Sequence, residues 1–389
     1  MKIYFVTGEP SGDLLASSLM KSLTDKIPDV EFYGTGGETM KSYGFKSLFN
    51  MAELTVMGFF EVLPRLPLIL KRITQTVADI EKINPDIIIT VDSWGFVSTL
   101  LKRLKKRNIT IPKLHYVAPQ VWAWKKGRAK KVAKLVDRLM TLLPHEPQCF
   151  EKYGLKCDFV GHPVVENKVD EIDVNSFLIQ YNIPVNANIL VVLPGSRNSE
   201  VKRLIPIFRK SLDILSTKIE NLYVIIPTVE TVVNEVKKAF DTGDIPCLVV
   251  TGRTERYAAF KSSRMAIAAS GTVSLELASC GTPHLVAYKF NVLTNFLADI
   301  FVNVKYANLI NILCDKEIIP EFMLKKCRAD LIADKAMELT NMTVAKNMIK
   351  ETGEGLQKLR LPDVLPSERA AEIVVEMVRK NVNSQEIID

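Results

Sequence analysis

Short apolar segments alternate with longer amphipathic segments along most of the chain, and this alternation restricts the possible folds more than any other feature. Several short segments are apolar at every position, which is typical of strands buried on both faces of a parallel sheet. Amphipathic stretches such as Leu66–Ile83 and Arg203–Ile219 lie between them. The pattern predicts an α/β fold with parallel sheets and right-handed crossovers. We expect strands at Ile3–Val6, Asp86–Val91, Lys113–Val117, Arg138–Leu142, Ile189–Leu193, Leu222–Ile226, Cys247–Val250 and Met265–Ala269.

The alternation occurs twice, because it restarts near Ile189 after the polar stretch Val165–Asn188. A chain of 389 residues is long enough for two domains of ordinary size. We place the boundary near Gly161-His162-Pro163, which gives Rossmann-like domains at 1–163 and 164–360. In such sheets ligands bind beyond the carboxyl ends of the strands. With two such domains facing each other, we expect the site in the cleft between them.

The net charge of +7 is unevenly distributed, since no acidic residue lies between Ser93 and Val136. The positive residues of this stretch fit either a solvated helical face or a surface that sits on anionic lipid. On anionic lipid, each basic residue near the headgroups contributes about 1 kcal/mol. We call this set the basic strip: Lys102, Arg103, Lys105, Lys106, Arg107, Lys113, Lys125, Lys126, Arg128, Lys130, Lys131 and Lys134.

Cysteine and histidine positions argue against a disulfide framework or a metal site. The six cysteines form no CxxC pair, and the four histidines form no HxxxH pair. The N-terminus leads directly into a strand and does not resemble a signal peptide. No stretch reaches the ~18 uninterrupted apolar residues of a spanning helix. We therefore expect a cytosolic chain, or one attached to a membrane only peripherally.

The loop Leu193–Arg197 follows the strongest strand of the second half. Gly195, Ser196 and Arg197 offer a phosphate a backbone N–H, a hydroxyl and a forked guanidinium. An arginine in a surface turn is also commonly just solvated. The loop alone therefore fits a phosphate contact and an ordinary turn equally well.

A second segment raises the weight of the phosphate interpretation. Ser270 follows the strand Met265–Ala269 and is expected to cap the next helix, with the N–H groups of Gly271 and Thr272 facing a phosphate. Glu276 lies one turn later, placed to accept hydrogen bonds from a ribose diol. A capped core helix is the alternative. Because both loops lie at the same edge of one sheet, together they predict a nucleotide diphosphate in the second domain.

Two glycine-rich turns occur in the first half. Thr7–Asp13 follows the first strand and precedes a helix that begins near Leu14, so Ser11 and Gly12 stand where a helix N-terminus can face an anion. Gly34–Gly37 is a similar turn after a strand-like segment. Neither is a dinucleotide fingerprint, and a plain turn explains each as well as a binding loop does.

Asp92 ends the apolar strand Ile87–Val91, at the edge where chemistry occurs in this architecture. A carboxylate at this place fits a general base and a cap of the next helix equally well. The nearby stretch Leu54–Leu70 is apolar but interrupted by charges and prolines, and we favour an exposed apolar surface beside the cleft over a core cover. Its candidate lipid-facing residues are Met57, Phe59, Phe60, Leu66, Leu68 and Ile69.

Taken in order, the motifs resemble those of the lipid-A-disaccharide synthase family, which are inverting glycosyltransferases of the GT-B type. The resemblance covers about nine-tenths of the chain. It is specific because so many segments occur together in one order. The segments are GEPSGD, YGTGGETM, MGFFEVLP, HYVAPQVWAWKKGR, FVGHPVVE, LPGSRNSEV, SGTVSLELA, GTPHLVAYKFNVLTNFLA and KYANLINIL.

The resemblance implies transfer of 2,3-diacylglucosamine from its UDP donor to the 6-hydroxyl of 2,3-diacylglucosamine 1-phosphate, giving a β-1,6-linked disaccharide 1-phosphate and UDP. Asp92 is the implied general base and Arg197 neutralises the departing diphosphate. It implies no metal or other cofactor. Acyl chains on both sugars explain an apolar surface next to the basic strip, on a cytoplasmic enzyme peripherally associated with the inner membrane. The implied donor-binding residues are Gly195, Ser196, Arg197, Ser270, Gly271, Thr272, Glu276, Asn311 and Glu321.

The chain departs from the family pattern in three places. His145 stands where an aromatic residue is usual, and we assign it no role. Gly95 stands where a second aspartate is expected, and Leu324 stands where a glutamine is expected after Glu321. The resemblance also implies that the C-terminal segment 361–389 crosses back to the first domain, with a C-terminally swapped homodimer as a possible assembly.

Two other functions fit part of the sequence. Another UDP-sugar enzyme of the GT-B type, such as an N-acetylglucosaminyl transferase or an epimerase, would share the helix that carries Glu276 but would not need the apolar stretch Leu54–Leu70. A non-catalytic protein that binds membrane or nucleic acid would use the basic strip. The two phosphate loops and the lack of RNA-module aromatics count against nucleic acid as a partner.

Overall fold

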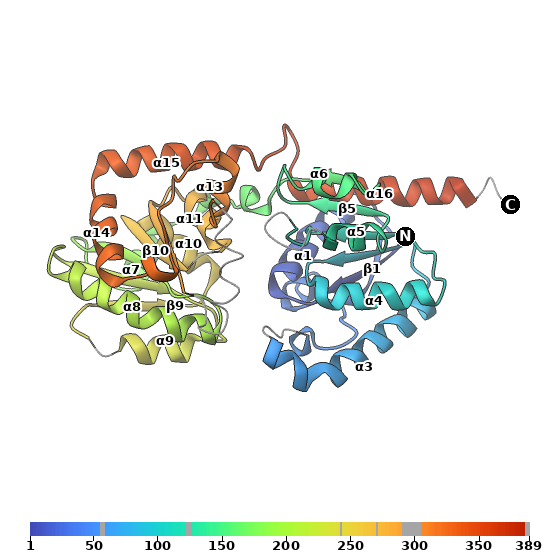
Figure 1. Ribbon diagram of the computed structural model, residues 1–389, viewed down its shortest axis with the longest axis horizontal. Coiled ribbons are helices and arrows are strands. Elements are labelled where there is room, and N and C mark those ends of the chain that lie inside the picture. The colour runs from blue at the N-terminus through green and yellow to red at the C-terminus, as the bar shows by residue number, and fades with distance from the viewer. Residues whose placement is uncertain (55–58, 122–126, 242, 270, 290–304, 386–389) are drawn as a thin grey trace. The chain divides into compact units, whose positions relative to one another are not determined.

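The computed structural model describes residues 1–54, 59–121, 127–241, 243–269, 271–289 and 305–385. The chain forms two compact units (Figure 1). Unit 1 comprises Met1–Val165 together with Leu359–Asp389, and unit 2 comprises Glu166–Lys358. No helix within the described ranges is long and apolar enough to cross a membrane.

Unit 1 is built on a parallel sheet with the strand order β2-β1-β3-β4-β5-β6. The strands are β1 Lys2–Thr7, β2 Glu31–Thr35, β3 Ile87–Val91, β4 Lys113–Tyr116, β5 Arg138–Thr141 and β6 Lys156–Phe159. The helices are α1 Pro10–Lys26, α2 Glu38–Lys41, α3 Phe59–Ile83, α4 Trp94–Lys106, α5 Gly127–Ala133, α6 Pro147–Glu151 and α16 Pro366–Gln385.

Both faces of the unit 1 sheet are covered, which is why its strands carry apolar residues at consecutive positions. Ile3 and Phe5 of β1 pack with α1 and α16 on one face. Tyr4 and Val6 pack with α3, α4 and α5 on the other face. Since successive side chains of a strand point to opposite faces, a strand between two helical layers is apolar throughout.

Unit 2 repeats this plan with the parallel strand order β12-β11-β10-β7-β8-β9. Its strands are β7 Asn188–Leu193, β8 Leu222–Pro227, β9 Cys247–Val250, β10 Met265–Ala269, β11 His284–Tyr288 and β12 Glu321–Met323. The helices are α7 Val174–Gln180, α8 Asn198–Ser216, α9 Val233–Phe240, α10 Arg253–Ser262, α11 Val273–Ser279, α13 Leu309–Cys314, α14 Ala329–Leu339 and α15 Met342–Gln357.

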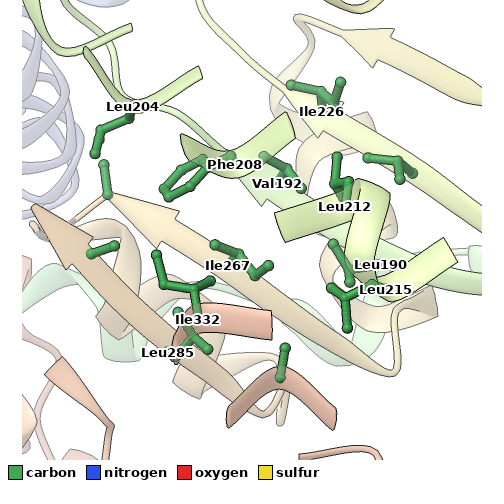
Figure 2. Close-up of a cluster of buried hydrophobic side chains, with 14 of the residues drawn as sticks. Leu190, Val192, Leu204, Phe208, Leu212, Leu215, Ile226, Ile267, Leu285 and Ile332 are labelled. Carbon is green, nitrogen blue, oxygen red and sulfur yellow. The ribbon is translucent and has the colours of Figure 1, made fainter. Parts of the chain in front are cut away.

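The larger core of unit 2 lies between the sheet and helices α8, α9 and α14 (Figure 2). Leu204, Phe208 and Leu212 of α8 recur every four residues and pack onto Leu190 and Ile267 of the sheet. The opposite face is covered by α7 and α10. The α/β fold with two parallel sheets, expected from the alternating pattern, is confirmed.

All eight strands expected from the sequence are present, and their ends differ from the expected ones by at most one residue. Of the four other strands in the described residues, β2 coincides with the strand-like segment that precedes Gly34–Gly37, and β6, β11 and β12 were not predicted. Both sheets reverse their strand order next to their first strand, between β1 and β3 in unit 1 and between β7 and β10 in unit 2. Ligands of open parallel sheets bind at such switch points, where the loops on either side diverge.

Candidate functional site

The switch point of unit 1 carries Asp92, which directly follows β3. Ser11 Oγ donates to Asp92 Oδ2 over 3.1 Å, and the Ser93 N–H donates to Oδ1 over 2.8 Å. The N-cap position of α4 is occupied by Ser93, so the carboxylate of Asp92 is not the cap of this helix. It is instead a partly exposed group held in a fixed orientation at the carboxyl edge of the sheet.

The turn that presents Asp92 is strained. Asp92 and Ser93 have φ angles of 52° and 44°, in the left-handed region that non-glycine residues avoid. Such residues cost of order 1–3 kcal/mol each and persist where the surrounding structure fixes them. Here the Asp92 N–H donates to the Tyr116 carbonyl over 2.9 Å, which ties the turn to β4. Strain of this kind concentrates at functional sites.

The glycines of the first loop allow it to approach this turn. A Cβ on Gly8 would lie 2.9 Å from Ser93 Oγ, and a Cβ on Gly12 would lie 3.2 Å from the Val91 carbonyl oxygen. Gly12 therefore lets the first turn of α1 bring Ser11 within hydrogen-bond distance of Asp92. The sequence places the two groups 81 residues apart, and only the parallel pairing of β1 with β3 brings them together.

Asp13 beside this loop is explained by hydrogen bonding within the fold, whereas Gly95 is surrounded by open space. Buried Asp13 accepts the N–H groups of Gly37, over 2.6 Å, and Thr39, over 2.8 Å, and so anchors the second glycine-rich turn. Gly95, at the position of the expected second aspartate, is exposed, and a Cβ there would meet no atom within 4 Å. The second carboxylate of the family pattern is thus absent at this position, while the Glu9 carboxylate lies near the turn and accepts from Ser93 Oγ over 3.3 Å.

The loop Leu193–Arg197 of unit 2 is where the sequence predicts a phosphate contact. Gly195 has a φ of 113°, and a Cβ on it would lie 2.7 Å from Glu200 Oε2, so both the turn and the packing require glycine. Ser196 and Arg197 are exposed at the carboxyl edge of the sheet. Arg197 Nη1 donates to Glu200 Oε1 over 3.0 Å, and the Tyr288 hydroxyl, at the end of β11, donates to the same oxygen over 3.5 Å.

Glu200 is a member of this site that the sequence did not reveal. Its carboxylate lies beneath the loop, and its side chain is 10% exposed against 49% for Arg197. Burial beside this carboxylate raises the pKa of Tyr288, which keeps the phenol protonated as a donor. Glu200 therefore orients Arg197 while leaving much of the guanidinium open to an anionic ligand.

The second predicted loop lies between β10 and α11. Ser270 falls outside the described residues, and the N-cap of α11 is Thr272, so the cap expected at Ser270 is wrong. The helix begins at Val273 because the turn takes two more residues than the capping pattern predicts. Gly271 and Thr272, which were expected in the first turn of the helix, lie directly before the helix that carries Glu276.

Glu276 is oriented through one of its two oxygens. Arg256 Nη2 and the Tyr257 hydroxyl each donate to Oε1 over 3.2 Å. Tyr257 in turn accepts a hydrogen bond from Asn167 Nδ2 over 2.6 Å. Oε2 receives no hydrogen bond from the described residues and stays open to a donor such as a ribose hydroxyl.

Asn311 and Glu321 lie together but do not point their polar atoms at a ligand. Asn311 is fully buried, and its Nδ2 donates to Glu321 Oε1 over 2.8 Å and to the Ile319 carbonyl over 2.7 Å. The Glu321 carboxylate also accepts the N–H groups of Ala307 and Asn308, over 2.8 and 3.0 Å. The two residues hold the chain around Asn308 in place.

The predicted lipid-facing segment is only partly described. Met57 lies outside the described residues, and the side chains of Phe59 and Phe60 in α3 are not described either. Leu66 is 42% exposed, whereas Ile69 packs against the buried cluster of unit 1 and Leu68 is half-buried. The exposed apolar surface at this end of α3 therefore includes Leu66 and also Leu70, which is 37% exposed.

The fold and the two loop clusters define a class of protein. The chain has a TM-score of 0.67 with the S. aureus MnaA–UDP co-structure, at 13% identity over 98% of this chain and 97% of that one. It has a TM-score of 0.66 with UDP-GlcNAc 2-epimerase from Neisseria meningitidis bound to UDP-GlcNAc, at 13% identity, covering 98% of this chain and 100% of that one. The fold is GT-B, the architecture of glycosyltransferases and UDP-sugar epimerases.

Sequence comparison then distinguishes among the members of this class. The profile of the family described as lipid-A-disaccharide synthetase (LpxB) matches residues 3–374. The chain is 43% identical to the lipid-A-disaccharide synthase of Paramagnetospirillum magneticum, over 98% of each protein, and 39% identical to that of Rickettsia typhi, over 96% of this chain and 98% of its relative. The chain belongs to the lipid-A-disaccharide synthase family, which confirms the predicted resemblance.

Proposed function

We propose that the chain transfers 2,3-diacylglucosamine from UDP to the 6-hydroxyl of 2,3-diacylglucosamine 1-phosphate, forming the β-1,6 disaccharide 1-phosphate and UDP. Family membership makes the chain a glycosyltransferase of lipid A disaccharide formation. The single observation that carries the chemistry is the fixed carboxylate of Asp92 at the switch point of unit 1.

Asp92 acts as the general base in this proposal. As the acceptor 6-oxygen attacks the anomeric carbon, the bond from that carbon to the diphosphate breaks, and Asp92 takes the hydroxyl proton. One base and one stabilised leaving group suffice for such an inverting displacement. Ser11 and the Ser93 N–H support the role because they fix both carboxylate oxygens. Gly95 carries no carboxylate, so the second aspartate of the family pattern does not share the base role here.

Arg197 stabilises the leaving diphosphate. Its exposed guanidinium, oriented by Glu200, offers the forked geometry that matches phosphate oxygens.

The other proposed donor-binding residues lie around Arg197 in unit 2. Gly195 and Ser196 supply further contacts of the same loop, with Ser270, Gly271 and Thr272 on the neighbouring loop. Glu276 holds the ribose through Oε2. We assign Asn311 and Glu321 to the donor site as residues that hold its backbone, because their polar atoms are bound to protein.

We further propose that unit 1 docks on the anionic cytoplasmic leaflet of the inner membrane. The exposed Leu66 and Leu70 of α3 lie near basic α4, since Arg103 Nη1 donates to the Leu70 carbonyl over 3.4 Å. An apolar edge beside positive charge is the arrangement expected of a peripheral lipid-binding surface. Docking there would allow the acylated substrates to be drawn from the bilayer.

The C-terminally swapped homodimer stays a prediction. α16 packs against α1 of its own chain, within unit 1. In a swapped dimer the same helix from a second copy would fill this place. The mass of the purified protein by light scattering distinguishes one copy from two.

The test of the reaction is UDP release by purified protein in detergent, supplied with the UDP-linked donor, the lipid acceptor, or both. Release that requires both substrates supports the proposal. Asp92→Asn should lower kcat by about 10²- to 10⁴-fold, the usual contribution of a general base, with UDP affinity unchanged. Asp86→Asn is the matched control, because Asp86 lies near the opposite end of β3 and accepts the Lys2 N–H over 2.7 Å.

Each part of the proposal has its own contrary result. Full activity of Asp92→Asn would reject the base assignment but not the substrates. Absence of turnover by the wild-type protein with both lipids would reject the substrates. Equal loss in Asp86→Asn would mean that the effect is on folding and not on proton transfer.

A further inference from the structure

Unit 2 contains a buried network of hydrogen-bonded polar side chains, next to the proposed donor-binding loops, that the sequence did not single out. It consists of His284 in β11, Ser274 in α11 and Asn308, the N-cap of α13. These side chains are between 0% and 2% exposed. Ser274 Oγ and His284 Nε2 are 2.7 Å apart, and Asn308 Nδ2 donates to the same Oγ over 2.7 Å. Polar groups buried so deeply are costly unless every one finds a partner.

The direction of each hydrogen bond follows from elementary chemistry. His284 Nδ1 lies 2.8 Å from the Thr282 carbonyl oxygen, which only accepts, so Nδ1 carries the hydrogen. Burial lowers the pKa of His284 to about 4, so the ring is neutral near pH 7 and Nε2 accepts. Ser274 must then donate to Nε2, which leaves its oxygen free to accept from Asn308. The hydrogen-bond network therefore has a single consistent set of donors and acceptors.

The hydrogen-bond network continues to residues that we expected to bind the UDP-sugar donor. Asn308 Oδ1 accepts the Ile310 N–H over 2.9 Å, which fixes the orientation of the amide. The backbone N–H groups of Ala307 and Asn308 donate to Glu321. Asn308 is thus held from one side by α11 and from the other by β12. The segment that contains it directly precedes α13.

This arrangement matters because α11 is short. A helix of seven residues has little stability of its own, so its position depends on the contacts its side chains make. Thr272 at its N-cap and Glu276 one turn later are among the residues that we propose bind the UDP-sugar donor. Ser274 lies between them in sequence and is the side chain that ties the helix to β11 and to Asn308.

We propose that His284, Ser274 and Asn308 are positioning residues for the donor nucleotide, which set the register between the first turn of α11 and the backbone at 307–308. The inference rests on the proposed UDP site in unit 2 and assigns that site a buried support. A misplacement of about 1 Å in a binding site can reduce activity on the order of a hundred-fold, so a small shift of α11 is enough to matter.

Ser274→Ala tests the inference with UDP as the probe. The variant removes the hydroxyl that joins His284 to Asn308. We expect UDP affinity by titration calorimetry to fall roughly ten- to a hundred-fold, and the KM for the donor to rise while the KM for the acceptor stays unchanged. Ser274→Thr keeps a hydroxyl and should restore most of the affinity.

A matched control separates positioning from stability. Ser211 of α8 is another fully buried serine of unit 2. Its hydroxyl hydrogen-bonds to the Ile207 and Ala329 carbonyls, away from the donor-binding loops. Ser211→Ala should lower the melting temperature without changing the UDP affinity of the folded protein. Asn308→Ser is the second variant, because serine still caps α13 but is too short to reach Ser274. It should weaken UDP binding as Ser274→Ala does.

The outcomes separate this inference from the function on which it rests. If wild-type protein does not bind UDP, the proposed donor site is wrong. If wild-type protein binds UDP and both Ser274→Ala and Asn308→Ser bind it equally well, the positioning role is wrong. If Ser211→Ala loses as much affinity as Ser274→Ala, the effect reflects general loosening of unit 2, which also overturns the inference.

Discussion

At the scale of single residues, backbone strain marks the proposed catalytic edge of unit 1. Asp92 and Ser93 after β3 have positive φ angles, and so does Val117 after β4, with a φ of 80°. A β-branched residue in this region is a genuine outlier. The three residues follow neighbouring strands, so the strained positions share one edge of the sheet. An observed outlier of this kind supports a functional role for the turn that contains it.

Arg197 provides a residue-scale prediction about the leaving group. Arg197→Ala should weaken UDP binding by about ten- to a hundred-fold, since a hydrogen bond to a charged group contributes roughly 1.5–3 kcal/mol. Uridine affinity should stay unchanged, because uridine lacks the diphosphate. Calorimetry with both ligands measures the difference.

Lys210→Ala is the control for Arg197→Ala, because Lys210 is exposed on α8, the helix that follows Arg197, and its loss changes the net charge equally. Equal weakening of UDP and uridine binding by Arg197→Ala would contradict a diphosphate contact. A similar loss in Lys210→Ala would point to a general effect of charge.

The position of a candidate site residue was predictable from the sequence where the residue lies in a loop that follows a recognisable strand. Asp92 directly follows β3, and Arg197 lies in the loop that follows β7, so the place of each at the sheet edge follows from a strongly apolar strand. Glu200 was missed because its role appears only when α8 folds its carboxylate under Gly195. Asn311 was expected at the donor, but its amide is saturated by backbone and Glu321 partners that no local pattern encodes.

At the scale of elements, α16 is an integral part of unit 1. Ala370, Ile373 and Val374 lie in the same buried cluster as β1 and α1. Beside them, Arg138 of β5 is 4% exposed and binds Asp158 of β6 through two hydrogen bonds of 2.6 and 2.9 Å. Its third contact is Glu376 of α16, over 2.9 Å. The buried guanidinium thus joins the sheet edge to the last helix.

This arrangement predicts a large effect at Arg138. Arg138→Ala leaves Asp158 without its buried partner and should destabilise unit 1 by about 3–5 kcal/mol, because breaking a buried ion pair from one side leaves an uncompensated charge. Glu376→Gln should cost less than about 1 kcal/mol, since Glu376 is 36% exposed and solvent screens it. The midpoint of urea unfolding measures both effects.

The exposed pair Lys335–Glu338 on α14 is the comparison for these variants. Lys335→Ala should leave the unfolding midpoint nearly unchanged, as is usual for surface pairs. If Arg138→Ala behaves like Lys335→Ala, the contact with α16 does not stabilise unit 1.

Strands were predictable mainly where the sequence shows a short apolar run. Most strands inside the two sheets have such a run and were expected. The exception is β11, which lies inside its sheet and is buried but begins with His284, and it was not predicted. β6 and β12 lie at the sheet edges as KCDF and EFM, half-exposed and short, so they lack that signal. α3 and α8 both begin several residues before the amphipathic pattern indicates, at Phe59 and Asn198.

At the scale of the whole molecule, charge distribution gives the prediction for membrane docking. Lys102 and Lys106 are exposed on α4 of unit 1. The double variant Lys102→Gln/Lys106→Gln should weaken binding to anionic phosphatidylglycerol vesicles about thirty-fold, from about 1 kcal/mol per basic residue. Binding should also fall as salt rises, since exposed charges are screened over ~8 Å at physiological ionic strength. Vesicle flotation measures both.

Lys325→Gln/Lys326→Gln removes the same charge from exposed positions of unit 2 and is the matched control. Equal weakening by the two double variants would show that net charge, and not the basic strip, drives the association. Equal binding of the wild-type protein to neutral phosphatidylcholine vesicles would contradict docking through charge altogether.

The discontinuity of unit 1 in sequence has a consequence for how the protein is made. Unit 2 is one continuous stretch, Glu166–Lys358, and all of it leaves the ribosome before α16 does. Unit 1 begins first, yet its core lacks α16 until that helix emerges. During synthesis the second unit can therefore finish folding first, while the nascent first unit keeps an open apolar face, and such exposed faces are what chaperones recognise. α16, which is translated after all of unit 2, then completes the core of unit 1.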